Sequence, residues 1–323
     1  RNIKNESKCE KLKDNYELAI KPYIEEGDYL ATIEELDNLI KSNKKLAPAY
    51  FARGLIYYIE ILDYSKAIND FNKVISLDPA FSDAYAWRSD YLIFELGDMV
   101  KGLKDANKSV EVDPNNAGAY LARGYAKQEY AYVALDKDQV DKAVTFAKEA
   151  IEDFTSVIDR PSFKVSSIYK RQYPYGILNN AYQQRGITYE ELGTVYRTNN
   201  KAKNRTMFRE MFKLAIDDYS YVIQNAPDRG DENDDGFFYT SKADGYRQRG
   251  NTYSWFDDFR RACNDWKKAK ALGDEDSREN YRISCLGRWF FNVRHTPNLS
   301  IDKGSWDEFI TFKESVMKEA AWP

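Results

Sequence analysis

The chain has 323 residues, of which 43% are hydrophobic and 31% charged, and this is enough apolar material for a large folded core. Its formal net charge of −4 at pH 7 argues against a protein that works mainly on nucleic acid or on an anionic membrane surface. No apolar run reaches the roughly 18 residues of a membrane-spanning helix. The first residue is Arg1 rather than Met, so we expect a trimmed chain and leave its localisation open.

Residues 1–45 are predicted to form a degenerate capping helix pair. The second helix has a clear start, since Asp28 precedes apolar Leu36 and Leu39 at helical spacing. In the first helix Pro22 lacks a backbone donor, and we expect it to interrupt the helix. An atypical first unit is expected in a stacked array, because its outer face meets water.

From residue 46 onward one pattern repeats, Tyr-x-x-Arg followed by Gly or Ser. The first copy contains Tyr50, Arg53 and Gly54, and the arginine of the second copy stands 35 residues after Arg53. The later copies are Tyr85-x-x-Arg88-Ser89, Tyr120-x-x-Arg123-Gly124, Tyr182-x-x-Arg185-Gly186 and Tyr246-x-x-Arg249-Gly250. A fixed period in this range is the signature of a solenoid of stacked units.

Each copy has a second half in which a small residue precedes an aspartate by three positions. The five instances are Ala67 and Asp70, Gly102 and Asp105, Ala150 and Asp153, Ala215 and Asp218, and Ala262 and Asp265. Residues three or four apart share one face of a helix, so each copy predicts two helices that approach closely at their small residues. We expect the five arginines to pair with the five aspartates between packed helices. Whether each pair lies within one copy or bridges two copies is left open.

This pattern resembles the tetratricopeptide repeat family, whose units are helix-turn-helix pairs of about 34 residues. The resemblance implies an all-α fold, a right-handed superhelical solenoid of such repeats with capping helices. It implies five repeats with insertions and a capping helix in residues 46–286, and a C-terminal extension with a final helix in residues 287–323. This fold hosts many functions, so the resemblance implies partner binding only in general terms.

Three stretches depart from the regular spacing, at residues 130–143, 160–180 and 197–213. The glycine of the first half and the small residue of the second are 13 residues apart in the first copy and 26 in the third, so we expect lengthened helices there. The 197–213 stretch is rich in Lys and Arg. We interpret it as a solvated helical hairpin, with a patch for an anionic partner as the alternative.

The sequence holds little that predicts catalysis. Its one histidine, His295, has no neighbouring cysteine or acidic partner, and the glycine motifs of nucleotide sites are absent. We therefore expect a protein that is not an enzyme and that carries no cofactor. Cys263 lies inside a repeat helix and is interpreted as a buried small hydrophobe, and a bridge from Cys263 to Cys285 is left open as the alternative.

One acidic stretch is a weak metal candidate. Asp231, Asn233 and Asp235 alternate as the oxygen ligands of a calcium loop do, but Lys242 stands where such loops carry a bidentate Glu. Because that ligand is missing, we expect calcium to bind there no tighter than roughly millimolar, or not at all.

The resemblance also implies a concave groove lined by the first helix of each repeat. Carried over by position, the groove residues are Phe51, Leu55, Tyr58, Asp90, Leu121, Tyr125, Gln183, Glu190, Arg247 and Asn251. We expect a few aromatic anchors, best represented by Phe51, Tyr58 and Tyr125, to carry most of the binding energy. The alternative is that the chain's own C-terminal segment, with a Trp-Phe-Phe run at residues 289–291, covers this groove.

These features predict a non-catalytic interaction scaffold that binds a segment of a protein or peptide partner in the groove. Asp90, Glu190 and Asp244 flank it, so a segment with Lys or Arg beside its apolar anchors is expected to bind best. No nucleic acid and no membrane insertion are expected, and the oligomeric state is left open. The alternative function is a small-ligand or ion-binding accessory component of a transporter or other assembly.

Overall fold

The computed structural model describes residues 2–159, 176–198, 202–228 and 240–286. Within these ranges every regular element is helical, as the sequence predicts. The chain divides into two compact units: unit 1 takes the described residues up to Leu214, and unit 2 takes those from Ala215 onward. The predicted final helix, His295 and the calcium candidates at 231–235 lie outside the described residues.

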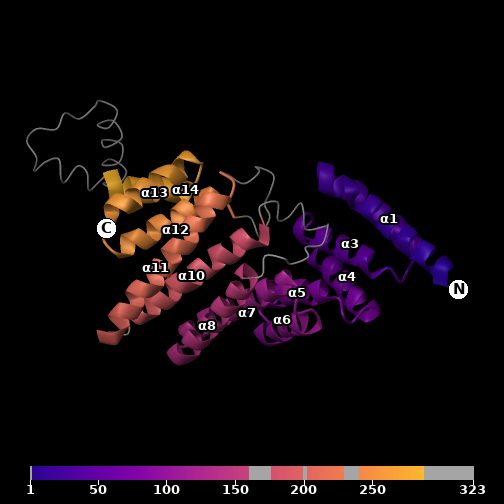
Figure 1. Cartoon of the computed structure of the whole chain (residues 1–323), viewed down its shortest axis with the longest axis horizontal. Helices are drawn as coiled ribbons and strands as arrows, with labels where there is room; N and C mark the ends of the chain where they lie inside the picture. Colours follow the sequence, from indigo (N-terminus) through magenta and orange to yellow (C-terminus); the bar gives the residue numbers. More distant parts are fainter. Residues whose placement is uncertain (1, 160–175, 199–201, 229–239, 287–323) are drawn as a thin grey trace, which may run out of the picture. The chain divides into compact units, whose positions relative to one another are not determined.

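Unit 1 is a row of helix pairs (Figure 1). The pairs are α1 (Asn2–Glu26) with α2 (Tyr29–Ser42), α3 (Ala47–Ile59) with α4 (Tyr64–Leu77), α5 (Ser82–Asp90) and its π-helical continuation η1 (Tyr91–Glu95) with α6 (Met99–Val112), and α7 (Ala117–Asp136) with α8 (Val140–Ile158). Next comes α10 (Gly176–Thr198), which packs on α8, and then α11 (Ala202–Asn225), within which unit 1 ends. Neighbouring pairs touch in sequence order, α2 on α3, α4 on α5 and α6 on α7, as a solenoid requires.

Unit 2 continues with the same kind of pair. It contains the end of α11, then α12 (Lys242–Trp255) packed on α13 (Phe259–Ala271), then α14 (Glu275–Tyr281) and the π-helical segment η2 (Arg282–Leu286). Ser241 and Asp244 form a capping box at the start of α12, in which each side chain accepts a hydrogen bond from the other residue's backbone N–H. This fixes where the first helix of the last pair begins.

One turn geometry joins the two helices of a pair. A residue with positive φ comes first: Gly27, Leu62, Gly97, Asp138 and Asp257 have φ between 56° and 73°. In four of these five turns the next residue is an aspartate whose carboxylate accepts a hydrogen bond from the backbone N–H three residues on, namely Asp28, Asp63, Asp98 and Asp258. The left-handed residue reverses the chain, and the aspartate satisfies a backbone donor that the helix start leaves unpaired.

The two helices of a pair touch at the small residues. A Cβ added to Gly124 of α7 would stand 2.5 Å from the Phe154 ring of α8, so only glycine allows this approach. The second repeat exchanges the two small positions: Ser89 replaces the glycine and Gly102 replaces the alanine. The Ser89 hydroxyl donates to the Gly102 carbonyl at 2.8 Å, so the extra side-chain atoms on α5 are offset by a missing methyl group on α6.

The predicted arginine–aspartate pairs form within the helix pairs. Four are present, Arg53–Asp70, Arg88–Asp105, Arg123–Asp153 and Arg249–Asp265, with closest N–O distances of 2.6 to 2.7 Å. Their aspartate side chains are only 2 to 12% exposed. The hydrogen bond to Asp70 raises the pKa of the Arg53 guanidinium. Each arginine also lies over the ring of the tyrosine three residues before it, at 5.4 to 5.7 Å.

Several of these arginines also reach back to the preceding second helix. Arg53 donates to Asp37 of α2, Arg88 to Asn72 of α4, Arg185 to Thr155 of α8 and Arg249 to Ser220 of α11. From the second repeat on, each acceptor stands two residues after the repeat aspartate of its helix. For the four observed pairs, the question that the sequence leaves open has one answer: each arginine–aspartate pair lies within one repeat. The contacts to the preceding repeat are additional bonds of the same arginines to other acceptors. The pairing of Arg185 with Asp218 stays a prediction.

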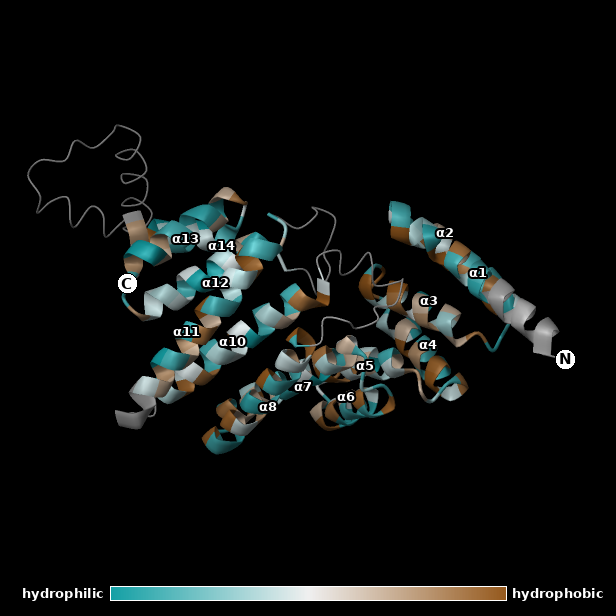
Figure 2. Ribbon diagram, in the orientation of Figure 1, coloured by the Kyte–Doolittle hydropathy of each residue, from teal (hydrophilic) through white to brown (hydrophobic). Residues whose placement is uncertain are grey.

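The core consists of several clusters of buried apolar side chains, each packed between neighbouring helices. Its largest fully buried side chains include Tyr23, Phe51, Phe71 and Phe154, which lie where one helix meets the next. Figure 2 shows apolar and polar residues alternating along α4, α6 and α8, as expected of helices that bury one face.

Two expectations about helix lengths have different outcomes. The lengthened third repeat is confirmed: α7 has 20 residues and α8 has 19, against 13 in α3 and 14 in α4. The expected interruption at Pro22 is wrong, because α1 continues through it to Glu26. Pro22 removes one backbone hydrogen bond near the end of the helix, and the fully buried side chains of Ile20 and Tyr23 hold that last turn against the core.

Cys263 and Cys285 form a disulfide that joins α13 to η2, with their Cα atoms 5.7 Å apart. The sequence interpretation of Cys263 as a free buried hydrophobe is therefore wrong. Both sulfurs belong to a small apolar cluster with Tyr253, Trp266 and Tyr281. The bridge closes a loop across 22 residues in unit 2 and fixes η2 to α13.

We expect reduction of this disulfide to lower the free energy of unfolding of unit 2 by about 3 kcal/mol, as is typical of a loop of this length. The measurement is urea unfolding with and without a reductant, with a Cys263→Ser variant as the reductant-insensitive control. Alkylation in denaturant should label one cysteine before reduction and all three afterwards. Labelling of all three cysteines without reductant would contradict the bridge.

Candidate interaction site

The apolar residues predicted to line a groove in unit 1 are buried in the structure. Phe51, Leu55, Tyr58 and Leu121 come from α3 and α7, and none of these side chains is more than 5% exposed. The Phe51 ring lies 5.0 Å from that of Phe81 and 6.0 Å from that of Phe71. These side chains fill space between helices, and their contact with a partner stays a prediction.

Asp90 of α5 is also buried, and its partner is Tyr58. The Tyr58 hydroxyl donates to Asp90 Oδ2 at 2.6 Å. Burial raises the pKa of Asp90 to about 7, with the nearby Glu95 carboxylate adding to the effect. Asp90 is therefore only partly ionised at neutral pH, which weakens its predicted role as a surface charge that attracts Lys or Arg.

A second group of polar side chains, from buried Asn180 to exposed Tyr132, links α7 to α10. The Tyr125 hydroxyl donates to Asn180 Oδ1 at 2.9 Å, and Tyr132 donates to Glu191. Burial raises the pKa of Glu191 to about 8. The sequence predicts Glu190 as a groove residue and does not single out Glu191. Both are half-buried, and desolvation of the Glu191 carboxyl favours its neutral form. Gln183, the remaining predicted residue on α10, is buried, and its Oε1 has no hydrogen-bond partner in the described chain.

The predicted residues of unit 2 are held by contacts within that unit. Arg247 pairs with Asp244, Asp274 and Asp276 at 2.6 to 3.4 Å. Asn251 Oδ1 accepts the indole N–H of Trp266 at 2.9 Å. Asp244 is thus engaged both by its capping box and by Arg247, so its charge is largely balanced inside the unit. Partner contact at Arg247 and Asn251 stays a prediction.

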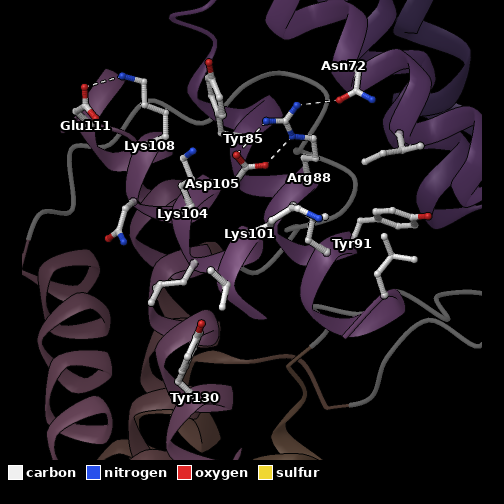
Figure 3. A pocket seen from close by; sticks show the side chains of 16 residues that line it. Asn72, Tyr85, Arg88, Tyr91, Lys101, Lys104, Asp105, Lys108, Glu111 and Tyr130 are labelled. Atoms are coloured by element: carbon white, nitrogen blue, oxygen red, sulfur yellow. Dashed lines mark hydrogen bonds and ion pairs between the residues drawn. The ribbon is translucent and has the colours of Figure 1, made fainter. Parts of the chain in front are cut away.

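An open groove of about 1200 Å³ lies elsewhere in unit 1, between the second helices α4 and α6 (Figure 3). We call it the α4–α6 groove. It is lined by Ile68, Asn72, Tyr85, Arg88, Tyr91, Leu92, Leu96, Val100, Lys101, Leu103, Lys104, Asp105, Asn107, Lys108, Glu111 and Tyr130. These residues come from α4, α5, η1, α6 and α7, so the whole groove is positioned by the second repeat and its two neighbours.

The second repeat forms this groove because its first helix ends differently from the others. After Asp90 the backbone widens into the π-helical segment η1, and π-helical turns are found often at functional sites. A Cβ on Gly102 would stand 2.3 Å from Ile93 of η1, so the glycine lets η1 lie directly on α6. Tyr91 and Leu92 then line the groove beside Leu96.

Two of the lining side chains are large, apolar and well exposed. Leu96 is 58% exposed and Val100 is 74% exposed. The sequence gives little signal for this, because the second position of a second helix is polar in α4 (Ser65) and α13 (Arg260) but aliphatic in α2 (Leu30) as well as in α6. The groove prediction from the sequence considers only the first helices.

The charged lining residues fall into a fixed set and an adaptable set. Arg88 and Asp105 form the wall of the groove, and Arg88 is held at both ends by Asp105 and Asn72 (Figure 3). Lys101, Lys104 and Lys108 lie along α6 at spacings of three and four residues, and so share one face of that helix. Within the described residues, the ion pairs of Lys101 and Lys108 are to carboxylates three residues away, Asp98 at the start of α6 and Glu111 near its end.

Among the described residues no cluster of His, Cys, Asp and Glu could hold a metal ion. None of the helices described has the length and apolar character of a membrane span.

No family model matches the chain, and no curated protein sequence matches it. Solved structures of helical repeat proteins do. PilW, a type IV pilus biogenesis factor, has a TM-score of 0.49 and 14% identity, over 83% of this chain and 97% of that chain. IFIT1, as a monomeric mutant with Gppp-AAAA, has a TM-score of 0.49 and 13% sequence identity, over 88% of this chain and 55% of that chain. A tetratricopeptide repeat protein from Parabacteroides merdae has a TM-score of 0.39 and 17% sequence identity, over 84% of this chain and 99% of that chain.

These scores lie below 0.5, so the assignment of the fold rests on the helix pairs themselves. Tandem pairs recur at 35 residues in the regular part, with small residues where the two helices touch and one pair packed on the next. The chain has the tetratricopeptide repeat fold. The fold explains how the α4–α6 groove is built, but it does not determine what the groove binds.

The buried carboxyl group of Asp90 predicts a pH dependence of stability. Its pKa is about 7 in the folded chain and near 4 when unfolded, so the folded state binds the extra proton and the free energy of unfolding falls as pH rises through this window. Relative to an Asp90→Asn variant, the natural chain should lose about 2–4 kcal/mol between pH 4 and pH 8.

Urea unfolding at the two pH values measures this loss. The control is Glu26→Gln, which removes an exposed carboxylate and should leave the pH dependence of the natural chain intact. An Asp90→Asn variant that keeps the full pH dependence would show that Asp90 is not the titrating group.

Proposed function

We propose that this chain is a non-catalytic interaction scaffold, and that the α4–α6 groove receives a segment of a protein partner. The observation that carries the proposal is an open groove with exposed aliphatic side chains, whose wall is held in place by the bonds of Arg88 to Asp105 and Asn72. The expected general function, a scaffold for protein partners, is kept, and its site is moved from the first helices to the second helices.

Burial of the groove's apolar side chains supplies the driving force. Leu96 and Val100 are exposed to water beside the half-buried Tyr91, Leu92 and Leu103. An exposed apolar patch with a polar rim is typical of a surface that binds another protein. Fully covering a side chain such as that of Val100 contributes about 1.5 kcal/mol or more.

The frame around the groove is suited to binding with little rearrangement. Arg88 connects α4, α5 and α6 through its bonds to Asn72 and Asp105, so the wall between the helices is fixed before a partner arrives. A preorganised site loses less conformational entropy on binding. The groove is open along its length and its polar groups are spread out, whereas small-molecule sites converge a few polar groups on one enclosed point. This favours a macromolecular segment over a small ligand.

The test is a selection of peptides from a displayed random library on the intact chain, followed by binding of the recovered peptides to two variants. Val100→Glu places a charge in the exposed apolar part of the groove, formed by Leu96 and Val100, which we call the apolar floor. Leu30→Glu is the matched control, because Leu30 is also an exposed aliphatic residue at the second position of a second helix.

We expect Val100→Glu to weaken binding of groove-directed peptides at least about tenfold, since an apolar contact is lost and a carboxylate is desolvated. Leu30→Glu should leave their affinity unchanged. Fluorescence anisotropy measures both, and circular dichroism checks the fold. Peptides that bind all three forms equally would show that the α4–α6 groove is not the binding site.

A further inference from the structure

We propose that the α4–α6 groove selects an acidic protein segment, with an aliphatic side chain set against Leu96 and Val100 and carboxylates set against the lysine row of α6. This inference rests on the proposed function and names the chemistry of the partner. The observation that carries it is that the exposed Leu96 and Val100 line the same groove as Lys101, Lys104 and Lys108. Figure 3 shows the three lysines along α6.

The lysines are available to a partner. Lys104 makes no ion pair within the described chain, and it is exposed. Lys101 and Lys108 pair with Asp98 and Glu111, but these are surface pairs between residues three apart, with lysine side chains 72% and 40% exposed. Such pairs contribute little to stability, so a partner's carboxylates can replace them at small cost.

The negative groups of the lining are fewer and less available. Asp105 is bound to Arg88 by two hydrogen bonds and belongs to the wall. Glu111 lies beyond Lys108 at the end of the lysine row and is already bonded to it. The groove therefore presents a net positive charge to an incoming segment, although the whole chain carries a net charge of −4.

The spacing of the row sets the spacing of the ligand. Lys101 and Lys108 are seven residues apart on α6, which corresponds to about 10 Å along the helix axis. Two carboxylates separated by about 10 Å, seven residues apart on a helix or three apart on an extended segment, would match both ends of the row. The aliphatic anchor would lie beside them, toward Val100.

The floor favours a protein segment over a nucleic acid. Single-stranded nucleic acids bind on aromatic faces along which bases stack. Here the tyrosine rings are engaged within the chain: Tyr130 lies 5.0 Å from Phe146, Tyr91 lies 6.3 Å from Tyr64, and Arg88 covers Tyr85. What is exposed is aliphatic, and aliphatic surface binds aliphatic side chains.

The test uses two short fluorescein-labelled peptides with the same leucine anchors, one flanked by glutamates and one in which every glutamate is replaced by lysine. A short single-stranded RNA is the third probe. Binding to the intact chain is measured by anisotropy at low and at high salt. The variants are Lys104→Glu with Lys108→Glu, Val100→Glu for the floor, and Lys41→Glu as a control on an exposed lysine of α2 outside the groove.

We expect the glutamate peptide to bind at least about tenfold more tightly than its lysine twin, and to weaken as salt screens the charges. The lysine reversals and Val100→Glu should each weaken it about tenfold or more, while Lys41→Glu should not. Equal or better binding of the lysine peptide, still dependent on Val100, would overturn the acidic preference and leave the proposed function standing.

Three other results would overturn the proposal in different ways. If Val100→Glu weakened the binding of no peptide, the proposed function would be overturned as well. Tight RNA binding that disappears with the lysine reversals, without a response to Val100→Glu, would assign the row to nucleic acid. Self-association of the chain that Val100→Glu abolishes, seen by sedimentation, would assign the groove to a second copy.

Discussion

The structure depends on one repeated interaction, the buried pair between an arginine of the first helix and an aspartate of the second. The guanidinium group has donors enough for two partners at once, and here it uses them. Arg53, Arg88 and Arg249 each bond to the aspartate of their own pair and also to an acceptor on the preceding second helix. Lysine could not make this planar, two-sided contact. The pair therefore fixes both the packing within a repeat and the stacking of one repeat on the next.

The α4–α6 groove is a local consequence of this frame. Arg88 holds α4, α5 and α6 in position, and the exchange of Ser89 with Gly102 lets η1 lie on α6, so that the turn with Leu96 and the start of α6 with Val100 stay exposed beside it. A rigid frame with an apolar, solvent-facing floor is the arrangement that binds a segment without first reorganising. The same pair that stabilises the repeat thus shapes the proposed binding site.

The sequence predicted the fold much better than the site. The Tyr-x-x-Arg pattern, whose first three arginines are 35 residues apart, and the aspartate of each second half are sufficient to predict the helix pairs, because periodicity indicates which residues share a face. Periodicity does not report what covers that face. The pattern therefore predicts groove positions for Phe51 and Tyr58, although other rings of the chain pack on both. Asp90 was treated as a surface charge, because burial and its effect on pKa depend on three-dimensional neighbours such as Tyr58. The exposure of Val100 has no distinguishing sequence signal, because Leu30 stands at the same position of α2 and is an exposed aliphatic residue too.

A double-mutant cycle on Arg249 and Asp265, measured by urea unfolding, tests most directly whether the pair holds the repeat together. Asp265 is 2% exposed and Arg249 19% exposed, so each single replacement, Arg249→Met or Asp265→Leu, leaves a charge largely buried and without its partner. Each single variant should lose about 3–5 kcal/mol, and the double variant, with an apolar pair, should lose far less than their sum. Additive losses in the double variant would show that the two side chains act independently, and would contradict the central role of the pair.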